Sequence, residues 1–280
     1  MALTTSLVIL ALFVVLASLC AVTFAPPNAA IIIDNGQQIA ATLLAALVIM
    51  LVSRSGGVER RTVARGLLVA LAFDSVAMLA WDFEPSSWTT AAGPVVGLFI
   101  VAIAILFATL ARALFHGLER SLLIPVILDA LIMVAAVITA FVAIWEFALG
   151  PSWRSPETAI PLIGAIVVFS GPAAGYLVLL HRRVQPSFRG AYAVLDGLTL
   201  LGIAWIVWLV LLARDGAAAA GVSLTDFAYS VGLVLLAYGV STWDVSSTLN
   251  PRLNRFASIN VALFPCSPSA SASSSACLHR

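Results

Sequence analysis

The chain has 280 residues, of which 62% are hydrophobic and 10% are charged, and its net charge at neutral pH is +1. Soluble globular domains carry about a quarter of charged residues, so this composition excludes a soluble domain and indicates a protein surrounded by lipid. No nucleic-acid-binding module is present in the sequence. The three cysteines have no paired metal-ligand spacing, and they predict neither a disulfide framework nor a metal site.

Long apolar runs follow one another along most of the chain. A helix of about 20 apolar residues spans the hydrocarbon core of a bilayer, and backbone polar groups in lipid must pair within their own helix. Each run therefore predicts a transmembrane helix. The eight runs cover residues 5–25, 38–53, 65–81, 94–113, 121–146, 160–180, 191–213 and 222–243. The predicted fold class is all-α, a polytopic integral membrane bundle that occupies residues 1–250.

The basic residues predict the orientation, because cytoplasmic loops retain arginine while translocated loops lack it. Eleven arginines follow the second, fourth, sixth or eighth run, namely Arg54, Arg60, Arg61, Arg65, Arg112, Arg120, Arg182, Arg183, Arg189, Arg252 and Arg255. The other four gaps hold only Arg154 and Arg214. We therefore expect a multi-pass protein of the bacterial inner (plasma) membrane with both termini in the cytoplasm.

The two ends of the chain each have a second interpretation. The first run also fits a secretory signal peptide with cleavage near residues 22–25, which would leave seven spans and an outer N-terminus. Residues 251–280 are rich in Ser, Ala and Pro, and such a segment cannot bury enough surface to fold, so we expect a disordered cytoplasmic tail. The apolar start of this tail, at 256–264, favours the alternative of a ninth span that is cut short by a shift of the reading frame.

Three of the predicted outward-running helices carry an aspartate, at Asp74, Asp129 and Asp196. Each lies seven to nine residues beyond an inner-face arginine. At 1.5 Å per residue, this spacing places the carboxyls at a similar depth of about 10 to 14 Å. A carboxyl inside a membrane suggests a proton or cation site made by all three. The alternative is that each carboxyl ties its helix to a neighbour through a hydroxyl or a backbone carbonyl.

Tryptophans and acidic residues gather where the third and fifth runs reach the outer face. Tryptophan is typical of this interface, because its ring is apolar and its N–H favours the headgroups. The alternative is an outer pocket that holds a cationic or amphipathic signal through carboxylate and cation–π contacts. Its candidate residues are Trp81, Asp82, Glu84, Trp145 and Glu146, with Trp205 and Trp208 from the seventh run.

No arrangement of catalytic residues is recognisable, so we expect no enzyme activity and no cofactor. His116 and His181 stand beside inner-face arginines, where contact with lipid headgroups explains them. The sequence has no phosphate-binding glycine loop and no paired-cysteine motif.

The region from about 112 to 244 resembles a known type of sensor. It contains Leu-Glu-Arg at 118–120, Leu-Asp-Ala-Leu-Ile at 128–132, Gly-Pro at 171–172 and Leu-Asp-Gly-Leu at 195–198. This pattern is similar to the multi-span N-terminal sensor region of actinobacterial GGDEF/EAL signalling proteins. The resemblance implies an input module that turns an outer or intramembrane signal into helix movement at 244–255. The GGDEF and EAL signatures themselves do not occur in the sequence.

The expected partners are membrane lipids and either a second copy of the chain or a signalling protein. Two other functions fit the residues. A small proton- or cation-coupled transporter would use Asp74, Asp129 and Asp196 as its ion sites, and a structural membrane subunit would use none of them.

The orientation is testable with reporter fusions. A fluorescent protein fused after Arg54 should be bright, because that gap is predicted to be cytoplasmic, whereas alkaline phosphatase should be active after Glu84 and inactive after Arg54. The reverse pattern would overturn the predicted orientation, and fusions at both sites in each reporter provide the matched controls.

Overall fold

The structure is a computed structural model, which describes residues 2–24, 27–54, 57–83, 94–115, 120–150, 156–181, 189–215 and 224–243. Within these ranges the chain is helical apart from short turns, and the predicted all-α class is confirmed. The eight helices are α1 (Ala2–Phe24), α2 (Pro27–Ser53), α3 (Val58–Phe83), α4 (Pro94–Phe115), α5 (Arg120–Leu149), α6 (Pro156–His181), α7 (Arg189–Asp215) and α8 (Leu224–Ser241). Residues 251–280, including the predicted tail, lie outside the described ranges.

The lengths and apolar composition of these helices identify a multi-pass membrane protein. Five helices contain a stretch long and apolar enough to cross a bilayer, at Gly36–Ser53, Val58–Ala80, Gly97–Phe115, Leu123–Phe147 and Arg189–Val207. The other three contain shorter apolar stretches within the described residues, at Thr5–Cys20, Ile166–Leu180 and Thr225–Ser241.

Two helices begin earlier than the apolar runs predict. α2 starts at Pro27 instead of residue 38, and α3 starts at Val58 instead of residue 65. The apolar runs mark only the segments that suit hydrocarbon, whereas helical hydrogen bonding continues into the polar residues beyond them. Asp34, which stands in the predicted outer gap between the first two runs, therefore lies within α2.

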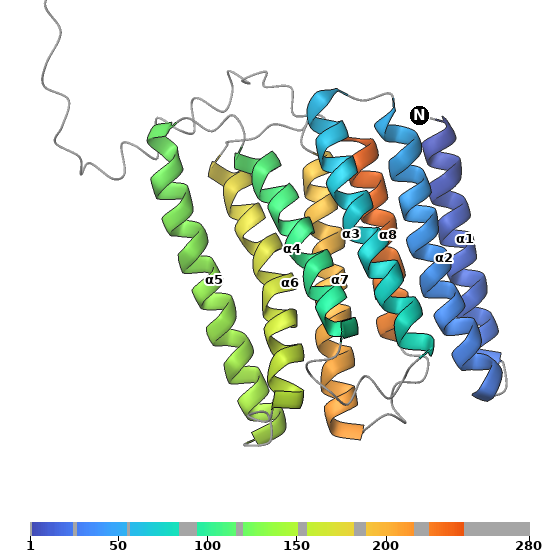
Figure 1. Ribbon diagram of the computed structural model, residues 1–280. Helices are drawn as coiled ribbons and strands as arrows, with labels where there is room; N and C mark the ends of the chain where they lie inside the picture. The colour runs from blue at the N-terminus through green and yellow to red at the C-terminus, as the bar shows by residue number, and fades with distance from the viewer. Residues whose placement is uncertain are drawn as a thin grey trace, which may run out of the picture. The chain divides into compact units, whose positions relative to one another are not determined.

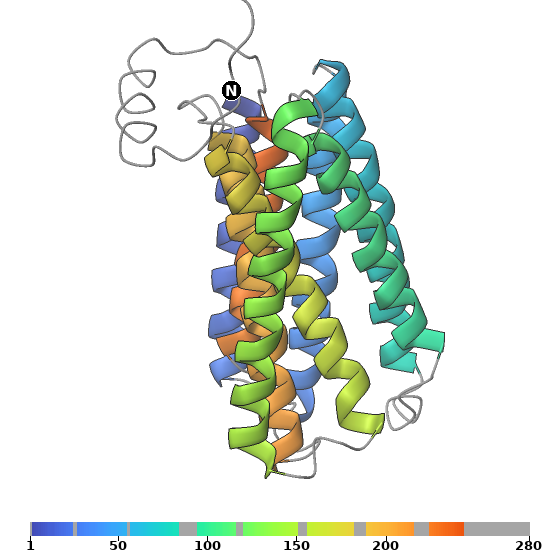
Figure 2. The same cartoon turned by 90° about the vertical axis from the view of Figure 1, so that its left-hand side faces the viewer.

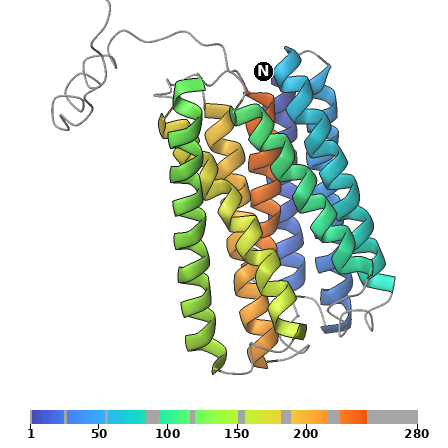
Figure 3. The same ribbon diagram turned by 60° about the vertical axis from the view of Figure 1, so that its left-hand side comes forward.

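The helices lie side by side, with α1 and α5 at opposite edges of the bundle (Figure 1). α8 is the most connected helix, because it packs against α1, α2 and α7 and touches α3. α3 packs against α4, and α6 packs against α4, α5 and α7. α5 packs against α6, which crosses it at an angle in Figure 2 and Figure 3, and α5 forms the left-hand edge of the bundle in Figure 3. Only 11% of the α5 span is buried, against 50% of the α7 span, so most of the α5 span lies at the surface of the bundle.

Glycine residues bring the backbones of α7 and α8 into close contact. Gly190 and Gly197 on α7 stand opposite Gly239 and Gly232 on α8, and the two glycines of each helix are seven positions apart in the sequence. A Cβ atom at Gly197 would lie 2.7 Å from the carbonyl oxygen of Gly232, and one at Gly239 would lie 2.6 Å from that of Gly190. The two backbones therefore approach more closely than any larger residue permits.

Replacing Gly197 with alanine should destabilise the bundle, because the new methyl group must push α7 away from α8. Overpacking of this kind costs about 1–3 kcal/mol. We expect a lower thermal unfolding temperature for Gly197→Ala in detergent. The matched control is Gly97→Ala on α4, where a Cβ atom meets nothing within 4 Å, and which should be neutral or slightly stabilising. Equal unfolding temperatures for the two variants would contradict the close contact.

Candidate functional site

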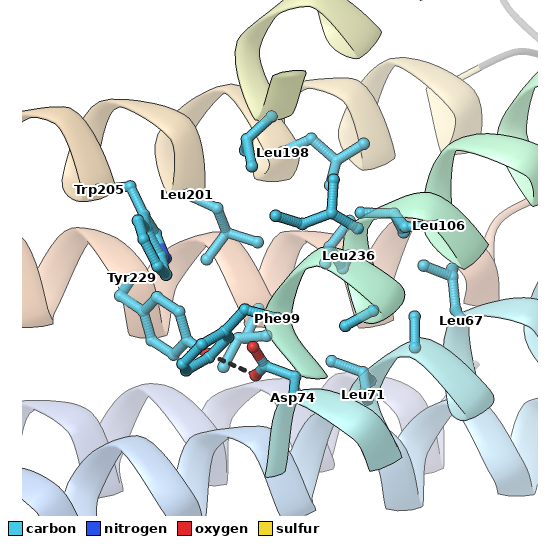
Figure 4. Close-up of a pocket in the computed structure, with 15 residues that line it drawn as sticks. Leu67, Leu71, Asp74, Phe99, Leu106, Leu198, Leu201, Trp205, Tyr229 and Leu236 are labelled. Carbon is cyan, nitrogen blue, oxygen red and sulfur yellow. Dashed lines mark hydrogen bonds between the residues drawn. The ribbon is translucent and has the colours of Figure 1, made fainter. Parts of the chain in front are cut away.

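A cavity of about 70 Å³ lies inside the bundle between the α3–α4 pair and the α7–α8 pair. It exists because these two pairs are each tightly packed, whereas α3 and α8 meet over only a short stretch. Figure 4 shows its walls, which come mainly from leucine, isoleucine, valine and alanine side chains. The polar groups of the lining are the side chains of Asp74, Tyr229 and Trp205.

Asp74 is held by a hydrogen bond that crosses this gap. The Tyr229 hydroxyl on α8 donates to Oδ2 of Asp74 on α3 over 2.6 Å. This distance is at the short end of the range for O–H···O hydrogen bonds. The bond joins two helices that otherwise have little contact, so it is a main link between the two halves of the cavity wall (Figure 4).

Hydrogen-bonded polar side chains, here called the polar seam, join α2 to α8 near the Tyr229–Asp74 hydrogen bond. Gln38 Nε2 donates to Asp226 Oδ1 over 3.0 Å, and Gln37 Nε2 donates to Ser230 Oγ over 3.4 Å. Gln37 and Ser230 are buried. Lipid offers these groups no hydrogen bonds, so their pairing holds α2 against α8.

Thr42 on α2 lies next to this polar seam and near Tyr229, whose hydroxyl donates to Asp74. Thr42 is buried, and its hydroxyl donates to the Gln38 backbone carbonyl over 3.0 Å. Polar contacts thus connect α2, α8 and α3 in succession.

Two aromatic rings close one end of the cavity. Phe99 on α4 and Trp205 on α7 meet edge to face, with ring centroids 5.4 Å apart and an angle of 76° between the planes. Such pairs are more favourable than the buried area alone accounts for. Figure 4 shows Trp205, Tyr229 and Phe99 together near Asp74, with Leu67 and Leu106 toward the other end.

The three membrane aspartates have separate surroundings. Asp74 alone among them lines the cavity. Asp196 is exposed, and the Tyr176 hydroxyl on α6 donates to its Oδ1. Asp129 is half-buried on α5, a helix that contributes no residue to the described lining. For Asp74 and Asp196, the geometry is that of a carboxyl tied to a neighbouring helix by a tyrosine hydroxyl.

The aspartates also differ in their positions along their helices. Asp74 follows Val58, the first residue of α3, by 16 residues. Asp129 follows the start of α5 by nine residues, and Asp196 follows the start of α7 by seven. The expected common depth was counted from Arg65, which lies inside α3 and does not mark the end of that helix.

The residues of the predicted outer pocket are only partly described. Trp81 and Asp82 lie at the end of α3 with side chains outside the described part, as does the side chain of Trp208 on α7. Glu84 is wholly outside it. Trp205, which the sequence placed with this group, lines the cavity beside Asp74 instead.

The side chains of Trp145 and Glu146 on α5 lie in different environments. Trp145 is 1% exposed, and its indole N–H has no hydrogen-bond partner among the described residues. Glu146 is exposed. An interfacial tryptophan would direct its N–H toward headgroups, whereas this ring is buried within the bundle, where the apolar area of the ring contributes to packing.

The sequence predicted Asp74 as a candidate site residue but not the residues around it. Gln37, Gln38, Asp226, Tyr229 and Ser230 were not among the predicted site residues. A signal was present, since residues 226, 229 and 230 have the i, i+3, i+4 spacing of one helix face. The two adjacent glutamines likewise stand at the start of an otherwise apolar stretch of α2.

No group of three or more metal-binding side chains occurs among the described residues. Comparisons with models of protein families, with curated proteins and with solved structures found no match to this chain. The cavity and its carboxyl are therefore the features on which a functional proposal can be built.

Removing the Tyr229 hydroxyl should weaken the bundle more than removing that of Tyr176. Interhelical hydrogen bonds in membranes contribute about 0.6 kcal/mol on average and up to about 1.7 kcal/mol. Tyr229→Phe should approach the upper value, because Asp74 is inside the bundle, while Tyr176→Phe acts at the exposed Asp196. The measurement is the unfolding free energy of each variant in mixed micelles. A larger loss for Tyr176→Phe would contradict this ranking.

Proposed function

We propose that this chain is an integral membrane sensor, the input module of a bacterial signalling protein, and that all eight helices cross the inner membrane with both ends in the cytoplasm. The observation that carries the proposal is the hydrogen bond from Tyr229 to Asp74. It connects the single carboxyl among the described residues of the cavity lining to α8. The resemblance of residues 112–244 to sensor regions of GGDEF/EAL proteins agrees with this role.

α8 has a second link to α3 at its other end. Arg60 Nε donates to the backbone carbonyl of Trp243 over 2.9 Å, just beyond the last residue of α8. A basic side chain at this position is favourable, because the last carbonyls of a helix lack internal partners. Asp74 and Arg60 of α3 therefore contact opposite ends of α8, about 20 Å apart at 1.5 Å per residue.

The proposed mechanism is a change in the position of α8 against α3. A cationic ligand that pairs with the Asp74 carboxylate weakens it as the acceptor of the Tyr229 hydrogen bond, so it favours arrangements in which the two helices are separated. Such differential affinity is what a transmitted signal requires. α7 should move with α8, because the glycine contacts hold their backbones together. The movement would reach the residues that follow Trp243.

A proton- or cation-coupled transporter is the second candidate, since a carboxyl in an intramembrane cavity also suits an ion site. It draws on Asp74 alone, because Asp129 and Asp196 do not line the described cavity. Flux through the protein distinguishes it from a sensor.

The proposal is testable with the full chain fused at its C-terminal end to a diguanylate cyclase domain as a reporter. Asp74→Asn and Tyr229→Phe should shift cellular cyclic di-GMP by about fivefold or more, the scale of a typical allosteric coupling. Asp196→Asn is the matched control, because it neutralises a membrane aspartate outside the cavity, and it should leave the output near that of the parent fusion.

A parallel assay follows internal pH in proteoliposomes with a trapped pH-sensitive dye. A sensor should show no proton flux that depends on Asp74. Unchanged cyclic di-GMP at equal fusion levels would contradict the sensor proposal, and a flux that is lost in Asp74→Asn would favour the transporter.

A further inference from the structure

We infer that the cavity at Asp74 accepts a small organic cation of the primary ammonium class, with the ammonium group on Asp74 and the alkyl part against the aliphatic walls. This inference rests on the proposed function, in which the cavity is the ligand site of a sensor, and it names the class of that ligand. Binding itself is measurable whether or not the chain is a sensor.

The charge of the cavity selects a cation. Oδ2 of Asp74 accepts the Tyr229 hydrogen bond, and Figure 4 shows the other carboxylate oxygen directed into the cavity. The described lining includes no arginine or histidine, so it supplies no positive charge to balance a carboxylate there. An unbalanced charge in a cavity with mostly apolar walls is strongly unfavourable, and a bound ammonium group would compensate it. An anionic ligand would be repelled by the same carboxylate.

The rings next to Asp74 also favour a cation. Phe99 and Trp205 line the same end of the cavity, and the electron-rich face of an aromatic ring attracts positive charge. An ammonium group that contacts the free carboxylate oxygen would lie among these side chains. Their effect adds to that of the carboxylate.

The size and walls of the cavity restrict the ligand further. Its volume of about 70 Å³ is about half that of the 150 Å³ cavity known to admit benzene, so it suits a group of a few heavy atoms. Beyond Asp74, Tyr229 and Trp205 the walls are apolar, which suits an alkyl group. A bare metal cation such as Ca²⁺ requires six or more oxygen ligands, whereas the lining offers only one carboxylate and one hydroxyl.

The test uses the purified full chain in nanodiscs of phosphatidylcholine, a lipid without net charge, and radiolabelled methylammonium as the probe in equilibrium dialysis. The parent protein should show saturable binding to one site. Asp74→Asn preserves the size of the side chain but removes its charge, and it should weaken binding by about 100-fold or more. The matched control, Asp196→Asn, should bind within about twofold of the parent, since its effect is that of a surface charge outside the cavity.

A second variant tests the cavity without touching the carboxyl. Ala102 is buried in the lining, and Ala102→Leu should fill part of the space and abolish binding while Asp74 stays in place. Thermal unfolding of each variant shows whether it is folded. If Asp74→Asn or Ala102→Leu has a lowered unfolding temperature, binding to the other variant tests the inference.

Three outcomes would overturn the inference, namely no saturable binding to the parent, equal binding to Asp74→Asn, or displacement of the probe by acetate. The cyclase fusion separates this failure from that of the proposed function. If methylammonium does not bind but Asp74→Asn still shifts cyclic di-GMP, the ammonium inference fails and the sensor stands. If methylammonium binds through Asp74 but the output ignores Asp74→Asn, the sensor fails and the ligand class stands.

Discussion

The close approach of α7 and α8 is the constraint on which the other contacts of this bundle depend. Lipid chains are as apolar as leucine, so burial of apolar area does not by itself hold helices together in a bilayer. Close backbone contact does, because dispersion forces act over many atoms at short range. The opposed pairs Gly190–Gly239 and Gly197–Gly232 supply that contact, and they fix α8 beside α7.

Once α8 is fixed, its polar side chains determine how α2 and α3 are attached. One face of the helix pairs Asp226 and Ser230 with glutamines of α2. Tyr229, on the same face, presents its hydroxyl to Asp74 of α3. Each such bond contributes about 1 kcal/mol in a membrane, far less than the extensive packing of α3 on α4. The junction of α3 and α8 is therefore a weak part of the cavity wall, and it contains the carboxyl.

The amino-acid composition predicted the fold class, but the sequence predicted the candidate site only in part. Long apolar runs predict helices reliably because backbone groups in lipid have no other partners. The predicted starts of α2 and α3 were wrong, because each helix begins before the apolar segment, in residues that hydropathy assigns to loops. Asp74 was predicted as a site residue, since a membrane carboxyl stands out in any sequence. Its separation from Asp129 and Asp196 depends on which face each helix turns inward.

The sequence by itself determined that the protein is a bundle of membrane helices and that Asp74 is costly to bury. These properties are local, because hydropathy and charge belong to each segment regardless of its neighbours. Only the tertiary structure decided that Tyr229 is the partner of Asp74, that Trp205 faces the cavity, and that Trp145 is buried. In a nearly uniformly apolar helix, no hydrophobic pattern shows which face meets protein and which meets lipid. That choice comes from the small residues and hydrogen bonds of helices far apart in the chain.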